Sequence, residues 1–239
     1  METSIPRGPL HVTLMAMGQA PRLYRWIWDE FRPHVGWVVL EIGAGVGHLT
    51  ECVLELPGRV VYATDVDPEL LNVLTERLGR RPQVFVLPHD ATQVFVAPDG
   101  RTPDTILCVN VLEHIEDDRR ALQAMYASLA PGGKLLLFVP AHPWLYGTVD
   151  RTIGHFRRYT KEDLWVKLTA AGFQVTRLWP FNPLGLVGWW WQGKVRRGTQ
   201  LEPWQTRWFD RLVPVLRRVP GLRGGLVGLS WLVVACKPA

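Results

Sequence analysis

The sequence predicts a single α/β domain, in which helices cover both faces of a mainly parallel sheet. The 239 residues are enough for one such domain with an elaboration. Short apolar stretches alternate with helical patterns in a regular order, and a glycine-rich turn follows the first of these stretches. Hydrophobic residues make up 47% of the chain and charged residues 21%, which excludes a disordered or fibrous protein.

The expected elements begin with an aromatic-rich helix at residues 23–31. Thr160 opens a late helix with Asp163 in the capping-box position, and Gly172 closes it. Strands are expected at 37–42, 59–64, 84–87, 105–109, 134–139, 174–179 and 231–237, and further helices at 47–56, 68–78 and 117–129. Residues 1–35 are expected to form a helical lid, and residues 182–228 a helical insertion between the last two strands.

Charge and cysteine content restrict the partners and the compartment. The net charge of +5 is local, because residues 185–228 hold eight Lys or Arg against Glu202 and Asp210. A nucleic-acid enzyme would spread such charge over its cofactor domain, so no nucleic-acid partner is expected. Cys52, Cys108 and Cys236 show no CxxC spacing, which argues against disulfides and a zinc site and favours a reducing, cytoplasmic setting.

Targeting and membrane-spanning segments are not expected. Residues 1–10 lack the apolar run of a secretory signal, and the most apolar stretch, 184–191, is far below the ~20 residues of a spanning helix.

The glycine-rich turn, Gly43 to Gly47, is the strongest functional motif. Glycines there let the backbone turn sharply and approach a ligand without a Cβ in the way. A dinucleotide fingerprint requires glycine at position 48, and this chain has His48. Glu41, two residues before the first glycine, is typical of the methyltransferase version of this turn.

Two acidic residues follow the second and third strands at the same edge of the sheet. Asp65 lies where a carboxylate can bind ribose hydroxyls; the alternative is a helix cap, but Asp67 fits that role better. Asp90 can receive an adenine amino group, with Ala91 supplying a backbone donor. Its alternative is an ordinary Asx-turn.

These motifs together resemble the class I S-adenosylmethionine (SAM) methyltransferases, in the broad group that includes the ubiquinone and menaquinone biosynthesis methyltransferases. The likeness covers about residues 24–181 and rests on VLEIGAGVG, TDVDPELL, HDAT, CVNVLEHIEDD and LAPGGKLLLFVPA. It implies a Rossmann-like seven-stranded sheet whose last strand is antiparallel, with SAM as the cofactor. The implied cofactor-binding residues are Glu41, Gly43, Ala44, Gly45, Gly47, Asp65, Val66, Asp90, Ala91, Asn110, Val111 and Leu112.

A long loop at residues 140–164 is similar to a segment of a bacterial subset of these enzymes and carries the run Gly-His-Phe-Arg-Arg-Tyr at 154–159. Long loops at the ligand edge of an α/β sheet usually bind substrate. The acceptor-site candidates are His142, Tyr146, Asp150, His155, Arg158 and Tyr159. The alternative is structural: the arginines pair with loop acids and Tyr159 packs on the core.

Methyl transfer requires alignment of acceptor and methyl group, and a base only if the acceptor loses a proton. His155, His142 and His114 have suitable unperturbed pKa values near ~6.5, and the sequence does not choose among them. The resemblance implies that His114 packs beneath the cofactor. No metal is expected, because the carboxylates and histidines are distributed as cofactor ligands and loop residues and do not form a clustered set of metal ligands.

The insertion places Trp189, Trp190 and Trp191 directly before a group of basic residues. It is expected to wall an acceptor pocket and to present a basic face to an anionic partner, either lipid headgroups or a phosphorylated, prenyl-like substrate. The alternative is that it completes the core or a homodimer interface. Residues 203–219 can form a helix, which Pro214 should kink.

The predicted function is SAM-dependent methylation of oxygen or carbon in a small or lipid-like acceptor. Two rivals remain open at this point: a non-catalytic SAM-binding or interaction protein, and a NAD-dependent oxidoreductase. His48 and the Glu113-His114 pair disfavour the oxidoreductase.

Overall fold

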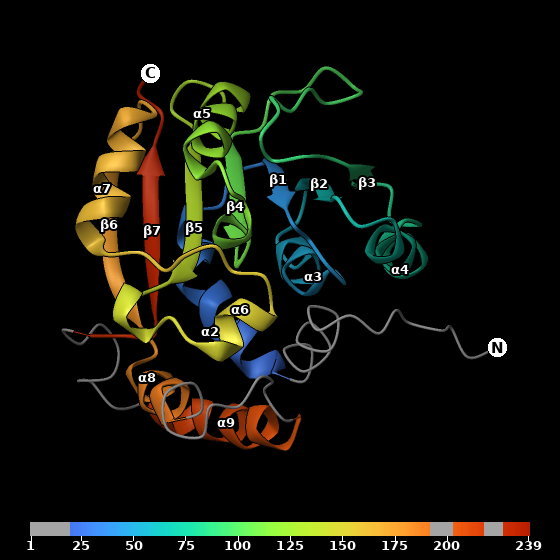
Figure 1. The fold of residues 1–239 in the computed structure, drawn as a ribbon. Helices are drawn as coiled ribbons and strands as arrows, with labels where there is room; N and C mark the ends of the chain where they lie inside the picture. Colours follow the sequence, from blue (N-terminus) through green and yellow to red (C-terminus); the bar gives the residue numbers. More distant parts are fainter. Residues whose placement is uncertain (1–19, 192–202, 218–226) are drawn as a thin grey trace.

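The computed structural model describes residues 20–191, 203–217 and 227–239 (Figure 1). Its centre is a seven-stranded sheet in the order β3-β2-β1-β4-β5-β7-β6. Strands β1 to β5 pair in parallel, and β7 runs antiparallel to both β5 and β6. The bounds are β1 Val38–Ile42, β2 Val60–Asp65, β3 Val84–Pro88, β4 Thr105–Val109, β5 Lys134–Pro140, β6 Gln174–Phe181 and β7 Ser230–Cys236. The predicted fold class, including the antiparallel last strand, is confirmed.

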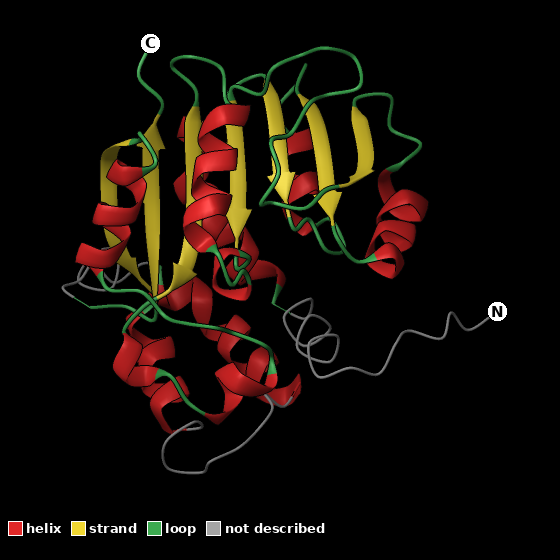
Figure 2. Ribbon diagram, turned by 45° about the horizontal axis from the view of Figure 1, so that its top comes forward, coloured by secondary structure: helices red, strands yellow, loops and turns green. Residues whose placement is uncertain are grey.

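Helices cover both faces of the sheet (Figure 2). Alternate strand residues point to opposite faces, so Val39 and Leu107 join one apolar cluster while Leu40 and Ile106 join the other. The first cluster includes residues of α2 (Pro21–Phe31), α3 (His48–Leu54), α4 (Pro68–Leu78) and α9 (Pro203–Leu216). The second includes residues of α5 (Asp118–Ser128) and α7 (Lys161–Ala170).

Local capping signals explain where several helices begin. Asp67 accepts a hydrogen bond from the Glu69 amide at the start of α4, and Thr160 accepts one from the Asp163 amide at the start of α7. Both helix starts were predicted from these residues. Pro214 lies inside α9, which continues to Leu216.

Short helices that the sequence did not predict shape the carboxyl edge of the sheet. A 3-10 turn, η2 (Leu112–His114), follows β4, and η3 (Pro143–Leu145) and α6 (Thr148–Thr152) follow β5. Their lengths are close to a single turn, which is too short for apolar periodicity to be visible.

The first described helix, α2, belongs to the body of the domain. Trp26, Ile27, Trp28 and Phe31 are buried, and the Asp210 carboxylate on α9 accepts hydrogen bonds from the amides of Arg22 and Leu23. Residues 1–19 of the expected lid lie outside the described residues. Within 20–35, only Leu23 and Tyr24 face the cavity described below.

The insertion contributes α8 (Pro183–Trp190) and α9, which lie beneath the carboxyl edge of the sheet (Figure 1). Among the described residues, no helix has the length and apolar character needed to cross a bilayer.

Candidate functional site

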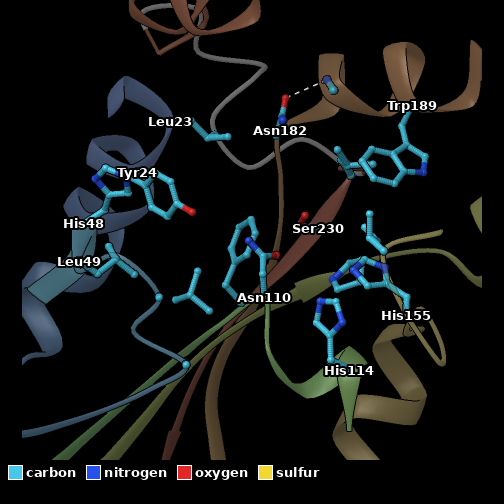
Figure 3. A pocket seen from close by; sticks show the side chains of 18 of the residues that line it. Leu23, Tyr24, His48, Leu49, Asn110, His114, His155, Asn182, Trp189 and Ser230 are labelled. Atoms are coloured by element: carbon cyan, nitrogen blue, oxygen red, sulfur yellow. Dashed lines mark hydrogen bonds between the residues drawn. The ribbon is translucent and has the colours of Figure 1, made fainter. Parts of the chain in front are cut away.

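A cavity of about 490 Å³ lies at the carboxyl edge of the sheet (Figure 3). The ends of β1, β4 and β5 form its floor through Ile42, Val109 and Phe138. The glycine-rich turn closes one end of the cavity, and His114 and His155 lie at the other. Helices α8 and α9 supply an apolar wall. The wall residues are Leu184, Gly185, Gly188, Trp189, Trp191, Trp208 and Phe209.

The glycine-rich turn depends on backbone conformations that other residues rarely adopt. Gly43, Gly45 and Gly47 have φ values of +68°, +56° and +88°. A Cβ on Gly43 would lie 2.3 Å from Cγ2 of Val111, whereas one on Gly45 would meet no atom within 4 Å. The turn is therefore packed tightly at Gly43 and open at Gly45.

Glu41 lies at the base of this turn and lines the cavity, with only 4% of its surface exposed. Its Oε2 accepts a hydrogen bond of 2.5 Å from the Thr50 hydroxyl. Burial raises the pKa of Glu41 to about 7, although the Thr50 hydrogen bond opposes the shift.

Asp65 is fixed by the backbone around it. Its Oδ2 accepts from the Gly45 amide at 2.9 Å, and its Oδ1 accepts from the amides of Val66 and Asp67 at 2.8 and 3.1 Å. A carboxylate has about four acceptor positions, so one position on Oδ2 is left for a ligand. Asp67 caps α4, which removes capping as the alternative role for Asp65.

Asp90 forms the Asx-turn that was its alternative role. Its Oδ1 accepts from both the amide and the hydroxyl of Thr92, and the backbone hydrogen bond from Thr92 lowers the pKa of this exposed carboxyl. The predicted cofactor residues fall into two groups. Glu41, Gly43, Ala44, Gly45 and Asn110 line the cavity, while Gly47, Asp65, Val66, Asp90, Ala91, Val111 and Leu112 lie outside its lining.

Two of the three candidate histidines meet at the far end of the cavity. The rings of His114 and His155 are 4.6 Å apart and nearly perpendicular. Burial, with the neighbouring His155, lowers the pKa of His114 to about 4. His142 lies outside the cavity lining, between Trp144 and Trp231, and its Nε2 is buried without a hydrogen-bond partner among the described residues.

A buried polar network holds His155 in place. The Asp150 carboxylate accepts hydrogen bonds from Nε of Arg158 at 2.8 Å, from the Gly147 amide at 2.9 Å and from Nδ1 of His155 at 2.9 Å. Burial opposes ionisation of Asp150, but the bond from His155 and the charge of Arg158 hold its pKa below the usual range. Trp189 of the insertion also points its indole N–H at Asp150, at 3.4 Å.

Three of the loop residues predicted to contact substrate lie outside the cavity lining and have hydrogen-bond partners within the protein. The Tyr146 hydroxyl donates to the His155 carbonyl, Asp150 is fully buried in the network, and Tyr159 is a core residue whose hydroxyl bonds Leu112 and Asp118. These three position the loop, because polar side chains without solvent contact must find partners inside the protein. Among the substrate candidates, Arg158 lines the cavity.

Glu113 was not among the predicted site residues, although the sequence places it directly before His114. Its side chain is fully buried, and neither oxygen has a hydrogen-bond partner among the described residues. Nε2 of His155 lies 3.8 Å from Oε1. Burial raises the pKa of Glu113 to about 7.

Glu113, His114 and His155 each offer a ligand atom within 4.8 Å of the others. The expectation that carboxylates and histidines do not cluster is therefore wrong here. His155 is distant in sequence, so only the folded loop brings it to the other two.

The chain is similar to known methyltransferases over part of its length. Residues 40–135 match the family model for a methyltransferase domain. The chain is 31% identical over 134 residues to a ubiquinone biosynthesis O-methyltransferase of Xanthomonas axonopodis, covering 55% of this chain and 52% of that protein. It is 29% identical over 165 residues to a demethylmenaquinone methyltransferase of Renibacterium salmoninarum, covering 69% and 64% of the two chains.

Solved structures share the fold at lower identity. The phosphoethanolamine N-methyltransferase 2 of Haemonchus contortus, in complex with SAM, superposes with a TM-score of 0.60 at 18% identity, covering 94% of this chain and 57% of that one. The chain spans about half the length of several curated relatives that it matches. Residues 40–135 thus resemble a methyltransferase domain, and the chain shares its fold with solved methyltransferase structures.

Proposed function

We propose that the protein transfers a methyl group from SAM to an oxygen or carbon atom of a small, largely apolar acceptor. The main support is a single cavity that joins the glycine-rich turn to a histidine-bearing end beneath a tryptophan wall. A cofactor at the turn and an acceptor at the histidine end would share one enclosed space, as direct transfer requires.

The residues at the turn fit SAM. The open space beside Gly45 lets a ligand approach the backbone, and the free position on Asp65 Oδ2 can accept a ribose hydroxyl. Glu41 provides a carboxylate for a cationic ligand in the cavity. When bound, SAM supplies an electrophilic methyl group on a positively charged sulfur.

The far end of the cavity suits an acceptor with one polar group on an apolar body. His114, His155 and Arg158 offer nitrogen atoms at this end, and the wall formed by α8 and α9 excludes water from the rest. The named quinone methyltransferases among the relatives are consistent with such an acceptor.

The decisive experiment offers candidate quinols, phenols and lipids to the protein with deuterated-methyl SAM, followed by mass spectrometry. We expect one class to gain a labelled methyl group. SAM binding by calorimetry with no labelled product from any class would favour the non-catalytic alternative, and preferential binding of NAD would favour an oxidoreductase.

SAM binding should tighten as pH rises from 6 to 8. Glu41 is largely neutral below its pKa of about 7 and charged above it, and a cationic ligand prefers the charged form. One linked proton limits the change to about tenfold per pH unit. Calorimetry of the wild type and Glu41→Gln tests this, because the substitution should flatten the profile; an equally steep profile in the variant would assign the effect to another group.

We also propose that α8 and α9 contact an anionic membrane surface. Val187, Trp190, Leu212 and Val215 expose between 42% and 58% of their surface and lie outside the cavity lining, on the same helices that wall the cavity. The insertion that carries them holds eight basic residues, and aromatic and basic side chains together favour the lipid interface.

Co-sedimentation with phosphatidylglycerol vesicles tests this proposal. Binding should weaken with salt, and Val187→Asp with Trp190→Ser should reduce it, whereas Val96→Asp, at an exposed valine distant in sequence, should not. A dimer by light scattering together with no vesicle binding at low salt would instead make the insertion an oligomer contact.

A further inference from the structure

The cluster at the far end of the cavity brings together two distant segments. Glu113 and His114 belong to η2 after β4, while His155 follows α6. The three ligand atoms lie within 4.8 Å of one another. Two imidazoles and one carboxylate form a common ligand set for divalent transition metals.

His155 is oriented as metal-binding imidazoles usually are, with one nitrogen held by an acceptor and the other left for the ion. Nδ1 of His155 bonds Asp150 at 2.9 Å, which leaves Nε2 near Glu113. His114 forms a hydrogen bond with the backbone of Gly154 through its ring. Asp150 is itself fixed by Arg158 and the Gly147 amide, so the support extends beyond the histidines.

Glu113 supplies the second, independent observation. A fully buried carboxylate with no hydrogen-bond partner among the described residues is costly for a folded protein. Arg158 does not relieve this cost, because its Nε donates to Asp150 and its Nη1 donates to the Ala141 carbonyl. A cation between Glu113 and the two histidines would satisfy the carboxylate.

We infer that Glu113, His114 and His155 together bind one divalent transition-metal ion, such as Zn²⁺, at the inner end of the cavity. The nitrogen ligands favour such an ion over Mg²⁺, which prefers oxygen ligands. Three protein ligands leave one position of a tetrahedral site open. His114 and His155 line the cavity, so the open position faces the space proposed for the acceptor.

The metal site would also take part in the proposed methyl transfer, and this catalytic consequence rests on the proposed function. The ion would hold an acceptor hydroxyl and favour release of its proton to water. The acceptor oxygen then forms a bond to the methyl carbon as the carbon–sulfur bond breaks, and the electron pair of that bond stays on sulfur. The acceptor class narrows accordingly to hydroxyl compounds such as phenols.

Metal binding can be measured without any acceptor. The full chain is stripped with a chelator, dialysed and titrated with Zn²⁺ against a chromophoric chelator, and with Co²⁺ by visible absorption. We expect one equivalent of either ion, without the near-ultraviolet band that a cysteine ligand would add. Excess Mg²⁺ should not displace the bound Zn²⁺ or Co²⁺.

Glu113→Gln and His114→Gln should each weaken Zn²⁺ binding by at least about tenfold, since even outer-shell changes cost 10–100-fold. His34→Gln is the matched control, because His34 precedes β1 and lies near Lys134 at the start of β5, which is the amino edge of the sheet. Near-ultraviolet circular dichroism checks that each variant is folded.

Absence of stoichiometric Zn²⁺ and Co²⁺ binding, or equal affinity in the wild type and both cluster variants, would overturn the metal site. His155 would then only connect Asp150 and Glu113 within the buried polar network. SAM binding and labelled methyl transfer are measured on the same samples, so failure of the metal site and failure of the proposed function give different results.

Discussion

Replacing Gly43 by alanine should abolish measurable SAM binding and destabilise the protein. The new Cβ would lie 2.3 Å from Cγ2 of Val111, and φ of +68° adds a cost of roughly 1–2 kcal/mol for a residue with a side chain. The turn must shift, and the backbone that faces the cavity shifts with it. Calorimetric titration with SAM and urea unfolding measure the two effects.

Substitutions of two other glycines separate the effect of the collision with Val111 from the effect of the left-handed backbone conformation. Gly45→Ala has the same left-handed backbone but meets no protein atom within 4 Å, so it should keep most of the stability and still lose SAM affinity by about tenfold or more. Gly100→Ala, also left-handed and unobstructed, should leave SAM binding unchanged. Val111→Ala should partly rescue Gly43→Ala by removing the obstructing methyl group. Normal SAM affinity in both Gly43→Ala and Gly45→Ala would place the cofactor elsewhere.

Replacing Arg158 by methionine should lower the free energy of unfolding by about 3–5 kcal/mol, the usual cost of removing one partner of a buried ion pair. Arg158 is 4% exposed, bonds Asp150 at 2.8 Å and stacks over the Trp189 ring at 4.7 Å. Its loss leaves the Asp150 carboxylate buried without its arginine partner. Urea unfolding at neutral pH measures the change.

Arg25→Met is the matched control. Arg25 also forms a bidentate pair, with Glu55, but both side chains are more than 40% exposed. Solvent screens such a pair, so its loss should cost less than about 1 kcal/mol. Similar losses in the two variants would mean that the Arg158 network is not a buried ion pair in solution.

The sequence predicted the sheet and the glycine-rich turn because both depend on local patterns. Apolar stretches such as residues 105–109 are buried on both faces of the sheet, and the turn requires glycine at fixed positions. Asp67 and Thr160 indicate helix starts for the same reason, because a capping side chain accepts a hydrogen bond from a backbone amide two or three residues further along the chain.

The far end of the cavity could not be predicted in this way. Asp150 and Tyr159 are polar residues in a long loop, which favours a role as substrate contacts, but the folded loop buries Asp150 against Arg158 and brings Tyr159 to Asp118, 41 residues away in sequence. Glu113 looked like an ordinary acidic residue, and only folding of the loop brings His155 next to it. Burial of polar groups is a property of the whole fold and leaves no periodic pattern.

The insertion leaves the sheet and returns to it at nearly the same point. Phe181 at the end of β6 pairs with Ser230 at the start of β7, and the Leu229 amide bonds the Asn182 carbonyl at 3.0 Å. The pairing of these residues holds the two ends of the insertion together, and it does not depend on the segment that connects them. A related protein could exchange this segment wholesale, or shorten it to a tight hairpin, and so acquire a different acceptor while its cofactor half stayed intact. Evolution of specificity in this chain is in that sense decoupled from the evolution of its fold.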